Sequence, residues 1–448
     1  MTTEKQWPVR FTGDPSNAVP WLKDHGVERV RLEWVDYNGI ARGKAFTLAQ
    51  FERGLGGSFA YCATALAFDT QANVVPGTDF AETIGYGDFV AVPDFSSMRL
   101  LKHESAAALV MGDLVWPDHR PIEAEPRRVL KRVVGETKAL GFEAMAAAEF
   151  EFYLLDKDHR LVDSGTQAYS SQKRAQWLAE EYALLDAAQA HAEIEAGHYE
   201  YGPGQYEINI LYRDILGAAD DSHLFRATMK EAALAIDRRV TFMAKPFDKK
   251  TGNSCHVHLS LWRDGVNLFA DRGAPMKISE TCRHFIGGTL AHMKELTAIY
   301  FPNANSYRRL VPGLFAPISL AWGVDNRTAS VRVINETASG TRVELRVCGG
   351  DAHVHLVFAA YLAAGLDGIR NRIEPGPVAT GDLDVDRKAE RLPDDWGRAL
   401  DALEASSWAK AALGEAFIKN YLAVKRYEYD NWRRTVTDQE RDIYIEWL

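Results

Sequence analysis

Four segments of the chain alternate between apolar and polar residues, which is the pattern of a β-strand with two different faces. In the first segment, AAEFEFYLL (147–155), Phe150 and Phe152 fall on one side of the strand, and Glu149 and Glu151 fall on the other. The other three segments are GQYEINI (204–210), CHVHLSLW (255–262) and TRVELRV (341–347). Their polar sides carry Gln205, Glu207 and Asn209, then His256, His258 and Ser260, and finally Arg342, Glu344 and Arg346. We therefore expect one core-facing side and one strongly charged side in each strand.

A single strand of this kind is typical of a sheet that faces water, and that explanation serves for any one of the four. Four together favour a metal site, because carboxylates gathered on one face repel one another unless cations lie between them. Carboxylates with one or two histidines and no thiolate suit Mg²⁺ or Mn²⁺ better than structural zinc. Arginines accompany these segments and could neutralise phosphoryl oxygens. They are Arg308, Arg309, Arg327, Arg332, Arg342 and Arg346.

The order of the remaining elements predicts an α+β chain of two domains. Two β-rich runs flank Asn38-Gly39, which is a strong hairpin signal. A polar, proline-containing stretch, WPDHRPIEAEP (116–126), separates this region from a helix that Pro126 begins and Gly141 ends. We therefore expect a β-rich domain over residues 1–116 and a larger domain over residues 117–448.

Composition narrows the class of protein further. Of the 448 residues, 62 are acidic and 52 are Lys or Arg, so the net charge is −10, which argues against nucleic acid as a partner. No apolar run could act as a signal peptide or a membrane span, so we expect a cytoplasmic protein without a membrane partner. Cysteines are scattered without a CxxC pair and are expected to be free, buried thiols: Cys62, Cys255, Cys282 and Cys348. Neither a P-loop nor a GxSxG elbow occurs in the chain.

Read in order, the motifs resemble the glutamine synthetase family over nearly the whole chain. They run DYNGIARGK, AEFEF, HYEYGPGQYEI, TFMAKP, CHVHLSL, NSYRRLVPG, DNRTASVRV and VELRV. The resemblance implies an amino-terminal β-grasp domain and a catalytic domain with a curved antiparallel sheet. It also implies a homo-oligomer with active sites between subunits, most often a dodecamer of two stacked hexameric rings.

The resemblance also implies the roles of individual residues, with ATP as co-substrate and Mg²⁺ or Mn²⁺ as cofactor. One metal site would use Glu151, Glu200 and Glu207, and the other Glu149, His256 and Glu344. ATP would lie against Tyr212, His258, Ser260, Arg332 and Arg342. Glutamate would be held by Gly252, Arg309 and Arg346. Arg327 would reach the transferred phosphoryl group, and Glu200 would be catalytic as well as a metal ligand.

Two departures from the family pattern concern the ammonium site. The family's flap, NSYKRLVPGYEAP, reads NSYRRLVPGLFAP here, so Phe315 stands in place of a glutamate. The family's FDGSS-like segment reads GLGGSFAYCATALAF, with no acid from Gly54 to Phe68. An amine pocket formed by Phe315, Phe59 and Tyr61 is the expectation that follows. Thr251 further replaces an asparagine near the glutamate amino group, which leaves open an acyl substrate other than glutamate.

These departures give three hypotheses. The first is an ATP-dependent ligase that joins glutamate to a hydrophobic or aromatic monoamine, because a pocket without acids can hold apolar carbon but not an unpaired cation. The second is an ammonium-using glutamine synthetase with a different base. The third is a catalytically silent scaffold or regulator, which the retention of all six metal ligands argues against.

Overall fold

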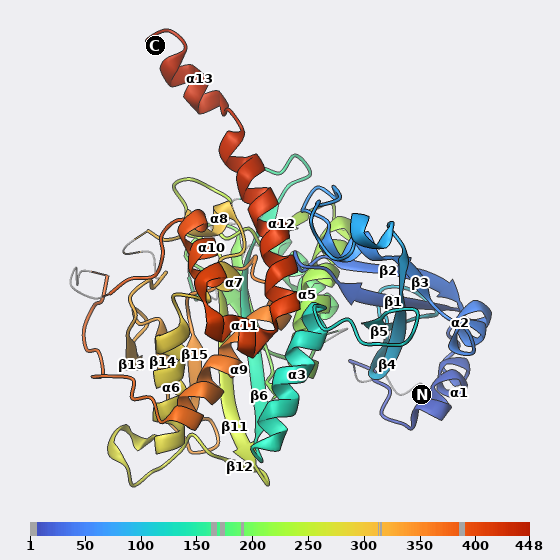
Figure 1. Ribbon diagram of the computed structural model, residues 1–448, viewed down its shortest axis with the longest axis horizontal. Helices are drawn as coiled ribbons and strands as arrows, with labels where there is room; N and C mark the ends of the chain where they lie inside the picture. The colour runs from blue at the N-terminus through green and yellow to red at the C-terminus, as the bar shows by residue number, and fades with distance from the viewer. Residues whose placement is uncertain are drawn as a thin grey trace.

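The computed structural model describes residues 7–162, 168–170, 175–189, 192–311, 313, 316–384 and 390–448. It shows two β-sheets with helices packed around them, and a carboxyl-terminal helix that projects from the body (Figure 1). None of the described helices has both the length and the apolar composition that a membrane span requires.

The amino-terminal sheet has five strands in the order β2-β1-β5-β4-β3. Their bounds are β1 Arg29–Val35, β2 Ala41–Thr47, β3 Ala60–Cys62, β4 Asp88–Leu100 and β5 Ala107–Val115. Strands β1 and β2 form the predicted hairpin, in which Val35 pairs with Ala41 and Gly39 takes a positive φ of 72°. The central pair β1 and β5 is parallel, and α2 (Leu48–Leu55) follows the hairpin, as expected for a β-grasp domain.

The second sheet has ten strands and brings the four alternating segments side by side in the order β15-β11-β6-β8. The ten strands are β6 Glu143–Leu155, β7 Ile194–Tyr199, β8 Gln205–Ile210, β9 Arg213–Asp214, β10 Arg239–Thr241, β11 Cys255–Arg263, β12 Val266–Asn267, β13 Trp322–Val324, β14 Val331–Ile334 and β15 Arg342–Leu345. Glu149 pairs with His256 on one side and with Asn209 on the other, and His258 pairs with Glu344. This register places the predicted polar residues on one face of the sheet.

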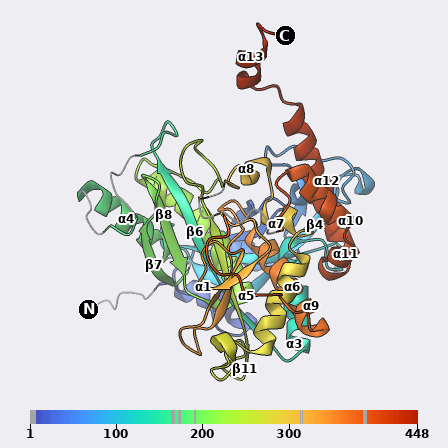
Figure 2. The ribbon, with the colours of Figure 1, turned by 90° about the vertical axis from the view of Figure 1, so that its left-hand side faces the viewer.

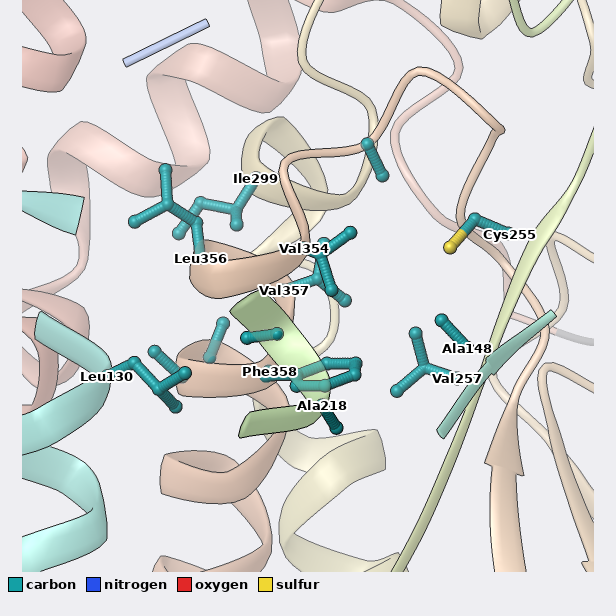
Figure 3. Packing of buried hydrophobic residues seen from close by; sticks show 14 of the residues in the cluster. Leu130, Ala148, Ala218, Cys255, Val257, Ile299, Val354, Leu356, Val357 and Phe358 are labelled. Atoms are coloured by element: carbon teal, nitrogen blue, oxygen red, sulfur yellow. The ribbon is translucent and has the colours of Figure 1, made fainter. Parts of the chain in front are cut away.

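The opposite face of this sheet packs against helices and forms the core. Val257 and Ala148 of the sheet lie near Phe358 of α9 and Ala218 of α5, as Figure 3 shows. The helix predicted from Pro126 is α3, and Glu125 caps it by accepting from the N–H groups of Arg127 and Arg128. The longer helices are α1 Ala18–Asp24, α3 Pro126–Ala139, α4 Ala175–Ala188, α5 Ile215–Ala235, α6 Glu280–His292, α9 Val354–Asn371, α10 Trp396–Ala405, α11 Ser407–Leu413, α12 Glu415–Arg434 and α13 Asp438–Tyr444, with single turns at α7 Thr297–Tyr300 and α8 Ala304–Tyr307.

Helices α6 and α9 approach so closely that glycine is required at their contact. A Cβ atom on Gly288 would lie 2.1 Å from the carbonyl oxygen of Ala364, and one on Gly368 would lie 2.1 Å from that of His284. Because a backbone atom cannot yield as a flexible side chain can, any larger residue would push the helices apart. This contact fixes α9, the helix that supports the site-bearing sheet from below.

Arg127 joins the two sheet regions through buried ion pairs. Its guanidinium lies 2.8 Å from Asp94 and 2.5 Å from Asp113 of the amino-terminal sheet, and 2.8 Å from Asp220 of α5. Asp220 in turn contacts His355 of α9 at 2.9 Å. Arg127 is 1% exposed and contacts three carboxylates, so its buried charge is paired. These ion pairs hold the amino-terminal sheet against α5.

The four cysteines are free, as predicted. Cys255, Cys282 and Cys348 are buried, but Cys62 is exposed, so the expectation of burial was wrong for that residue. The reason is strand alternation: Tyr61 points into the core of the amino-terminal sheet, and its neighbour on the edge strand β3 therefore points outward.

Candidate active site

A cavity of about 360 Å³ opens on the polar face of the second sheet. Figure 2 shows the strands of its outer side, β7 and β8, together with α4 at one edge of the molecule. Carboxylates, one imidazole, two guanidiniums and two tyrosine rings meet in it. Its lining consists of Glu149, Glu151, Tyr169, Glu200, Tyr201, Gln205, Glu207, Thr251, Gly252, Ser254, His256, Arg327 and Arg346.

Glu149 lies at the centre of the first group of metal-ligating atoms. His256 Nδ1 is 3.4 Å from one of its oxygens, and His258 Nε2 is 2.9 Å from the other. Together with Glu207 and His256, or with His258 and Glu344, it offers ligand atoms that all lie within 4.8 Å of one another. The buried Nε2 atom of His256 has no hydrogen-bond partner among the described residues, so it can accept a hydrogen bond from a ligand or coordinate an ion.

A second group is formed by His198, Glu200 and Glu207. His198 Nε2 lies 2.9 Å from Glu200 and 3.7 Å from Glu207. Glu151, the predicted third ligand here, is not among the ligand groups found in the described residues. Instead it accepts a hydrogen bond of 2.8 Å from the backbone N–H of Ser254, which turns its carboxylate toward the glycine-containing loop at residues 251–254.

The charge balance of these carboxylates fits divalent cations. Burial and the neighbouring charges of Glu149, Glu151 and Glu200 raise the pKa of Glu207 well above its usual range. Burial and Glu200 likewise raise the pKa of Glu151 to about 7. Mutual repulsion of this kind is relieved by a bound cation, since metal binding favours the ionised form of its ligands.

Glu149 and Glu344 behave differently because positive partners adjoin them. Burial opposes the ionisation of Glu344, but Arg346 and the two histidines outweigh it and lower its pKa to about 2. Burial also opposes the ionisation of Glu149, yet His258 and His256 hold its pKa well below the usual value. Neighbouring cations thus favour the ionised form of Glu149 and Glu344, whereas neighbouring carboxylates oppose it at Glu207 and Glu151.

A second, smaller cavity of about 190 Å³ adjoins the first at Glu149. It holds four of the five residues predicted for ATP, namely Tyr212, His258, Ser260 and Arg342. Arg342 donates a 3.1 Å hydrogen bond from Nε to His258 Nδ1. Arg332, the fifth, does not line either cavity in the described part of the chain and instead contacts Glu344 at 3.0 Å and Asp325 at 2.5 Å.

The predicted glutamate-binding residues lie around the first cavity. Gly252 and Arg346 line it, and Gly252 cannot carry a side chain because a Cβ would lie 2.6 Å from the carbonyl oxygen of Ala244. Arg309 is 2% exposed and lies behind the wall, where it donates to Ser254 Oγ at 2.6 Å and to the Val347 carbonyl at 2.9 Å. Arg327 lines the cavity beside Arg346. The Nε of Arg346 donates to the carbonyl oxygen of Arg327 at 3.1 Å.

The three residues predicted for an amine pocket have different settings. Phe315 lies outside the described residues. Phe59 is buried in the core of the amino-terminal sheet, stacked on Phe51 with ring centroids 5.3 Å apart. Tyr61 is buried as well, and its hydroxyl donates to the carbonyl of Leu32 at 3.1 Å. Packing therefore accounts for the apolar character of Phe59 and Tyr61 in this chain, and neither side chain is exposed to a bound amine.

Sequence analysis missed several residues of the two cavities and their surroundings, among them His198, Trp262 and Tyr169. His198 lies on β7 two residues before Glu200, Trp262 alternates with Ser260 on β11, and Tyr169 stacks on His198 with ring centroids 4.6 Å apart. The first two carried the same period-two signal as the residues that were found. Tyr169 carried none, because it lies outside any strand.

Comparison with known proteins agrees with this geometry. The family model of the glutamine synthetase catalytic domain matches residues 123–444. The chain is 34% identical to the glutamine synthetase of Thermus thermophilus over 442 residues, covering 95% of this chain and 97% of that protein. It is 32% identical to a glutamate–isopropylamine ligase of a Pseudomonas species over 446 residues, covering 95% and 96%. A solved structure titled "Apo GmaS without ligand" superposes with a TM-score of 0.85 at 29% identity, covering 96% of this chain and 99% of that one.

The matched domain spans both cavities, and the relatives cover nearly the full length of the chain. Members of the family are ligases that form carbon–nitrogen bonds and use ATP and divalent metal ions. The chain therefore belongs to the glutamine synthetase family.

Proposed function

We propose that this ATP-dependent carbon–nitrogen ligase joins the γ-carboxylate of glutamate to an organic monoamine with an apolar or aromatic substituent. The observation that carries the proposal is the loss of acids from the segments that bind ammonium in the family. The flap carries Phe315, and residues 54–68 contain no Asp or Glu. Identity alone does not decide the matter, because a glutamine synthetase and an amine ligase match the chain about equally well.

The first acid after this segment is engaged elsewhere. Asp69 is buried and accepts hydrogen bonds from the N–H groups of Gln71 and Asn73 at 2.9 and 2.8 Å, so it closes a turn. Residues 54–68 themselves offer an ammonium ion no counter-charge, and a buried cation without one costs several kcal/mol. An alkyl or aryl group in the same place would instead contribute about 0.8 kcal/mol per buried CH₂.

The reaction has two steps, and the residues in the first cavity suit both. An oxygen of the γ-carboxylate attacks the terminal phosphorus of ATP and ADP leaves. The amine nitrogen then attacks the acyl carbon, phosphate departs with the acyl oxygen, and the nitrogen loses a proton. The groups around Glu149 and around Glu200 would hold divalent cations, which neutralise phosphoryl oxygens and polarise them as Lewis acids. Arg327 and Arg346 would bind the negative charge from the other side of the cavity.

Proton removal favours an amine that is neutral at pH 7. An alkylamine whose pKa is near that of lysine, about 10.4, is almost fully protonated at that pH. Residues 54–68 supply no carboxylate that could act as the base. An arylamine avoids this difficulty, and we therefore place aromatic or bulky monoamines first among the substrates.

We also propose that the active form is a homo-oligomer, with two stacked hexameric rings as the arrangement that the family resemblance implies. Phe59 and Tyr61 do not support this arrangement by themselves, because each side chain is enclosed by its own sheet.

The test measures ADP release with saturating glutamate and Mg²⁺ against ammonium, isopropylamine, benzylamine, aniline and the diamine putrescine. We expect an apolar monoamine to give the highest kcat/KM and ammonium to give little or none. Phe315→Glu should weaken the preferred amine and gain ammonium use, whereas Phe315→Leu, which stays apolar, should not gain ammonium use. Faster synthesis of glutamine than of every amide would make the ammonium-using hypothesis correct, and no ADP release with any nucleophile would favour the silent scaffold.

A further inference from the structure

One wall of the smaller cavity is a loop with little internal support. The loop connects β14 to β15 over residues 335–341, and Ser339, Gly340 and Thr341 line the cavity. Its internal hydrogen bonds centre on Thr337, which accepts from the N–H of Gly340 at 3.0 Å and from the hydroxyl of Thr341 at 2.8 Å. Residues 336–339 are exposed. The position of this wall therefore depends on contacts from outside the loop.

Asn267 supplies such a contact from the rear of the wall. Its side-chain N–H groups donate to the carbonyl oxygens of Ser339 at 3.1 Å and Thr341 at 2.7 Å. Its side-chain oxygen accepts from the N–H of Phe269 at 2.9 Å. The residue is 7% exposed, so these bonds are formed in a largely dry environment where an unmade partner is costly. Both donors of the amide are thus engaged with the residues that flank Gly340.

A tight hairpin ties Asn267 to the opposite wall of the same cavity. Strands β11 and β12 are joined by Asp264 and Gly265, which both have positive φ, 50° and 75°, as type I′ turns require. The register that this turn sets pairs Asn267 with Trp262. Trp262 lines the cavity, stacks on Tyr212 with ring centroids 6.4 Å apart, and donates to Ser260 at 2.8 Å. One rigid hairpin therefore sets the spacing between the aromatic wall and the loop.

The loop also orients the guanidinium of Arg342. Arg342 follows it directly and donates from Nη1 to the carbonyl of Gly340 at 3.0 Å, while its Nε donates to His258 at 3.1 Å. If the wall shifts, this guanidinium shifts with it. We propose that Asn267 is a positioning residue for the nucleotide: it fixes the loop at residues 339–341 so that Arg342 and the aromatic pair meet a bound adenine nucleotide without reorganisation. The inference rests on nucleotide binding in the smaller cavity, which is part of the proposed function.

Asn267→Asp is the sharpest variant. It keeps the size of the side chain and the acceptor for Phe269, removes both donors, and places a carboxylate against two carbonyl oxygens. We expect KM for ATP to rise at least tenfold, with KM for glutamate within twofold of the wild type. Mg·ADP should also raise the melting temperature of this variant by less than it raises that of the wild type. A residue with only a structural role would lower kcat and the basal melting temperature without separating the two KM values.

Arg272→Ala is the matched control, because Arg272 also donates to two carbonyl oxygens of this loop, those of Asn335 and Glu336, at 3.0 and 3.2 Å. Those residues do not line the cavity in the described structure, so KM for ATP should stay within twofold. An equal rise in both variants, or an unchanged KM for ATP in folded Asn267→Asp, would overturn the proposal.

If Asn267→Asp does not fold, Thr337→Val gives a second measurement. Thr337 is exposed, so the fold is not at risk, and loss of its bond to Gly340 should raise KM for ATP about threefold. An unchanged value there would also contradict the proposal. All assays use whichever nitrogen nucleophile the enzyme accepts best, so a wrong choice of amine leaves this comparison intact. A wild-type enzyme that binds no nucleotide at all would refute the proposed function instead.

Discussion

Glu149 is the residue on which the two cavities meet. It lines both of them and belongs to two of the three ligand groups. Its position follows from strand register, because it is paired with His256 on one neighbouring strand and Asn209 on the other. A phosphoryl group passing between nucleotide and glutamate would have to cross at this point. We therefore expect Glu149 to be more sensitive to substitution than any other carboxylate of the site.

Glu149→Gln should abolish most turnover while leaving the fold intact. The change preserves the volume of the side chain but removes the charge that divalent cations need. Its side chain is 23% exposed, so no core cavity is created. We expect kcat to fall by more than the roughly 100-fold that loss of an outer-shell metal partner costs. ADP release and Mg²⁺ titration by calorimetry measure the effect, and near-normal amide synthesis at saturating Mg²⁺ would contradict the metal assignment.

Glu344→Ala should lose stability as well as activity, in contrast to Glu149→Gln. Glu344 is fully buried between Arg346, which it contacts closely, and Arg332 at 3.0 Å. Its removal leaves the buried Arg346 without its carboxylate partner, which costs about 3–5 kcal/mol, whereas Arg332 keeps Asp325 at 2.5 Å. Thermal unfolding of the two variants side by side measures the difference. Equal melting temperatures would show that solvent or a metal compensates for Glu344.

Arg327→Ala should act mainly on kcat. Arg327 lines the cavity near Glu200, whereas Arg346 is already engaged by Glu344, so Arg327 is the cation with more freedom to meet charge that develops during transfer. We expect a decrease of about 10²–10³ in kcat with KM for glutamate changed little. Steady-state kinetics at varied glutamate concentration measures both constants. A change in KM alone would show that Arg327 binds the substrate in the ground state.

At the level of secondary structure, the strands that carry the site could be predicted from the sequence. The contacts between their side chains could not. Period-two alternation placed Glu149, His256 and Glu344 on one face, and the structure brings them together. Which carboxylates share an ion depends on side-chain direction, and one oxygen of Glu151 is engaged by the backbone N–H of Ser254. Burial was also ambiguous, because an aromatic residue such as Phe59 can serve a core or a pocket. The domain division near residue 116 stays a prediction.

Three helices meet at His292, and this contact should make stability depend on pH. His292 of α6 lies 2.8 Å from Asp367 of α9, contacts Glu295 closely, and stacks on Trp408 of α11 with ring centroids 3.5 Å apart. Burial favours the neutral ring, but hydrogen bonds to Glu295 and Asp367 outweigh it and raise the pKa of His292.

A raised pKa means that the folded state holds the proton more tightly than the unfolded state. The resulting stability is complete below the unfolded pKa of about 6.5 and is lost as pH rises through the folded value. At pH 6 the free energy of unfolding of His292→Gln should therefore be about 1–2 kcal/mol lower than that of the wild type. This difference in stability should become smaller by pH 9. Melting temperatures across this range test the sign. A gap that widens with pH would show that the neutral ring is the stabilising form.

For the whole molecule, the projecting carboxyl-terminal segment is the feature that one chain does not explain. Helix α12 leaves the body and α13 continues beyond it (Figure 1). Beyond the body the segment carries Val436, Ile445, Trp447 and Leu448, whose exposed fractions are 70%, 68%, 83% and 98%. Apolar side chains gathered on a projecting segment mark an interaction site, and another copy of the chain is the partner that the proposed double ring supplies.

Deleting residues 436–448 should therefore reduce the size of the particle. If this segment joins one ring to the other, the truncated chain should form single rings, which mass photometry distinguishes from double rings by a factor of two in mass. The amine pocket would lie between neighbours of one ring, so amide synthesis per chain should stay within a few fold of the full-length enzyme. The melting temperature should fall, because apolar burial between copies is lost. An unchanged particle would show that other surfaces hold the assembly together, and a complete loss of activity in intact single rings would place the amine pocket across the rings instead.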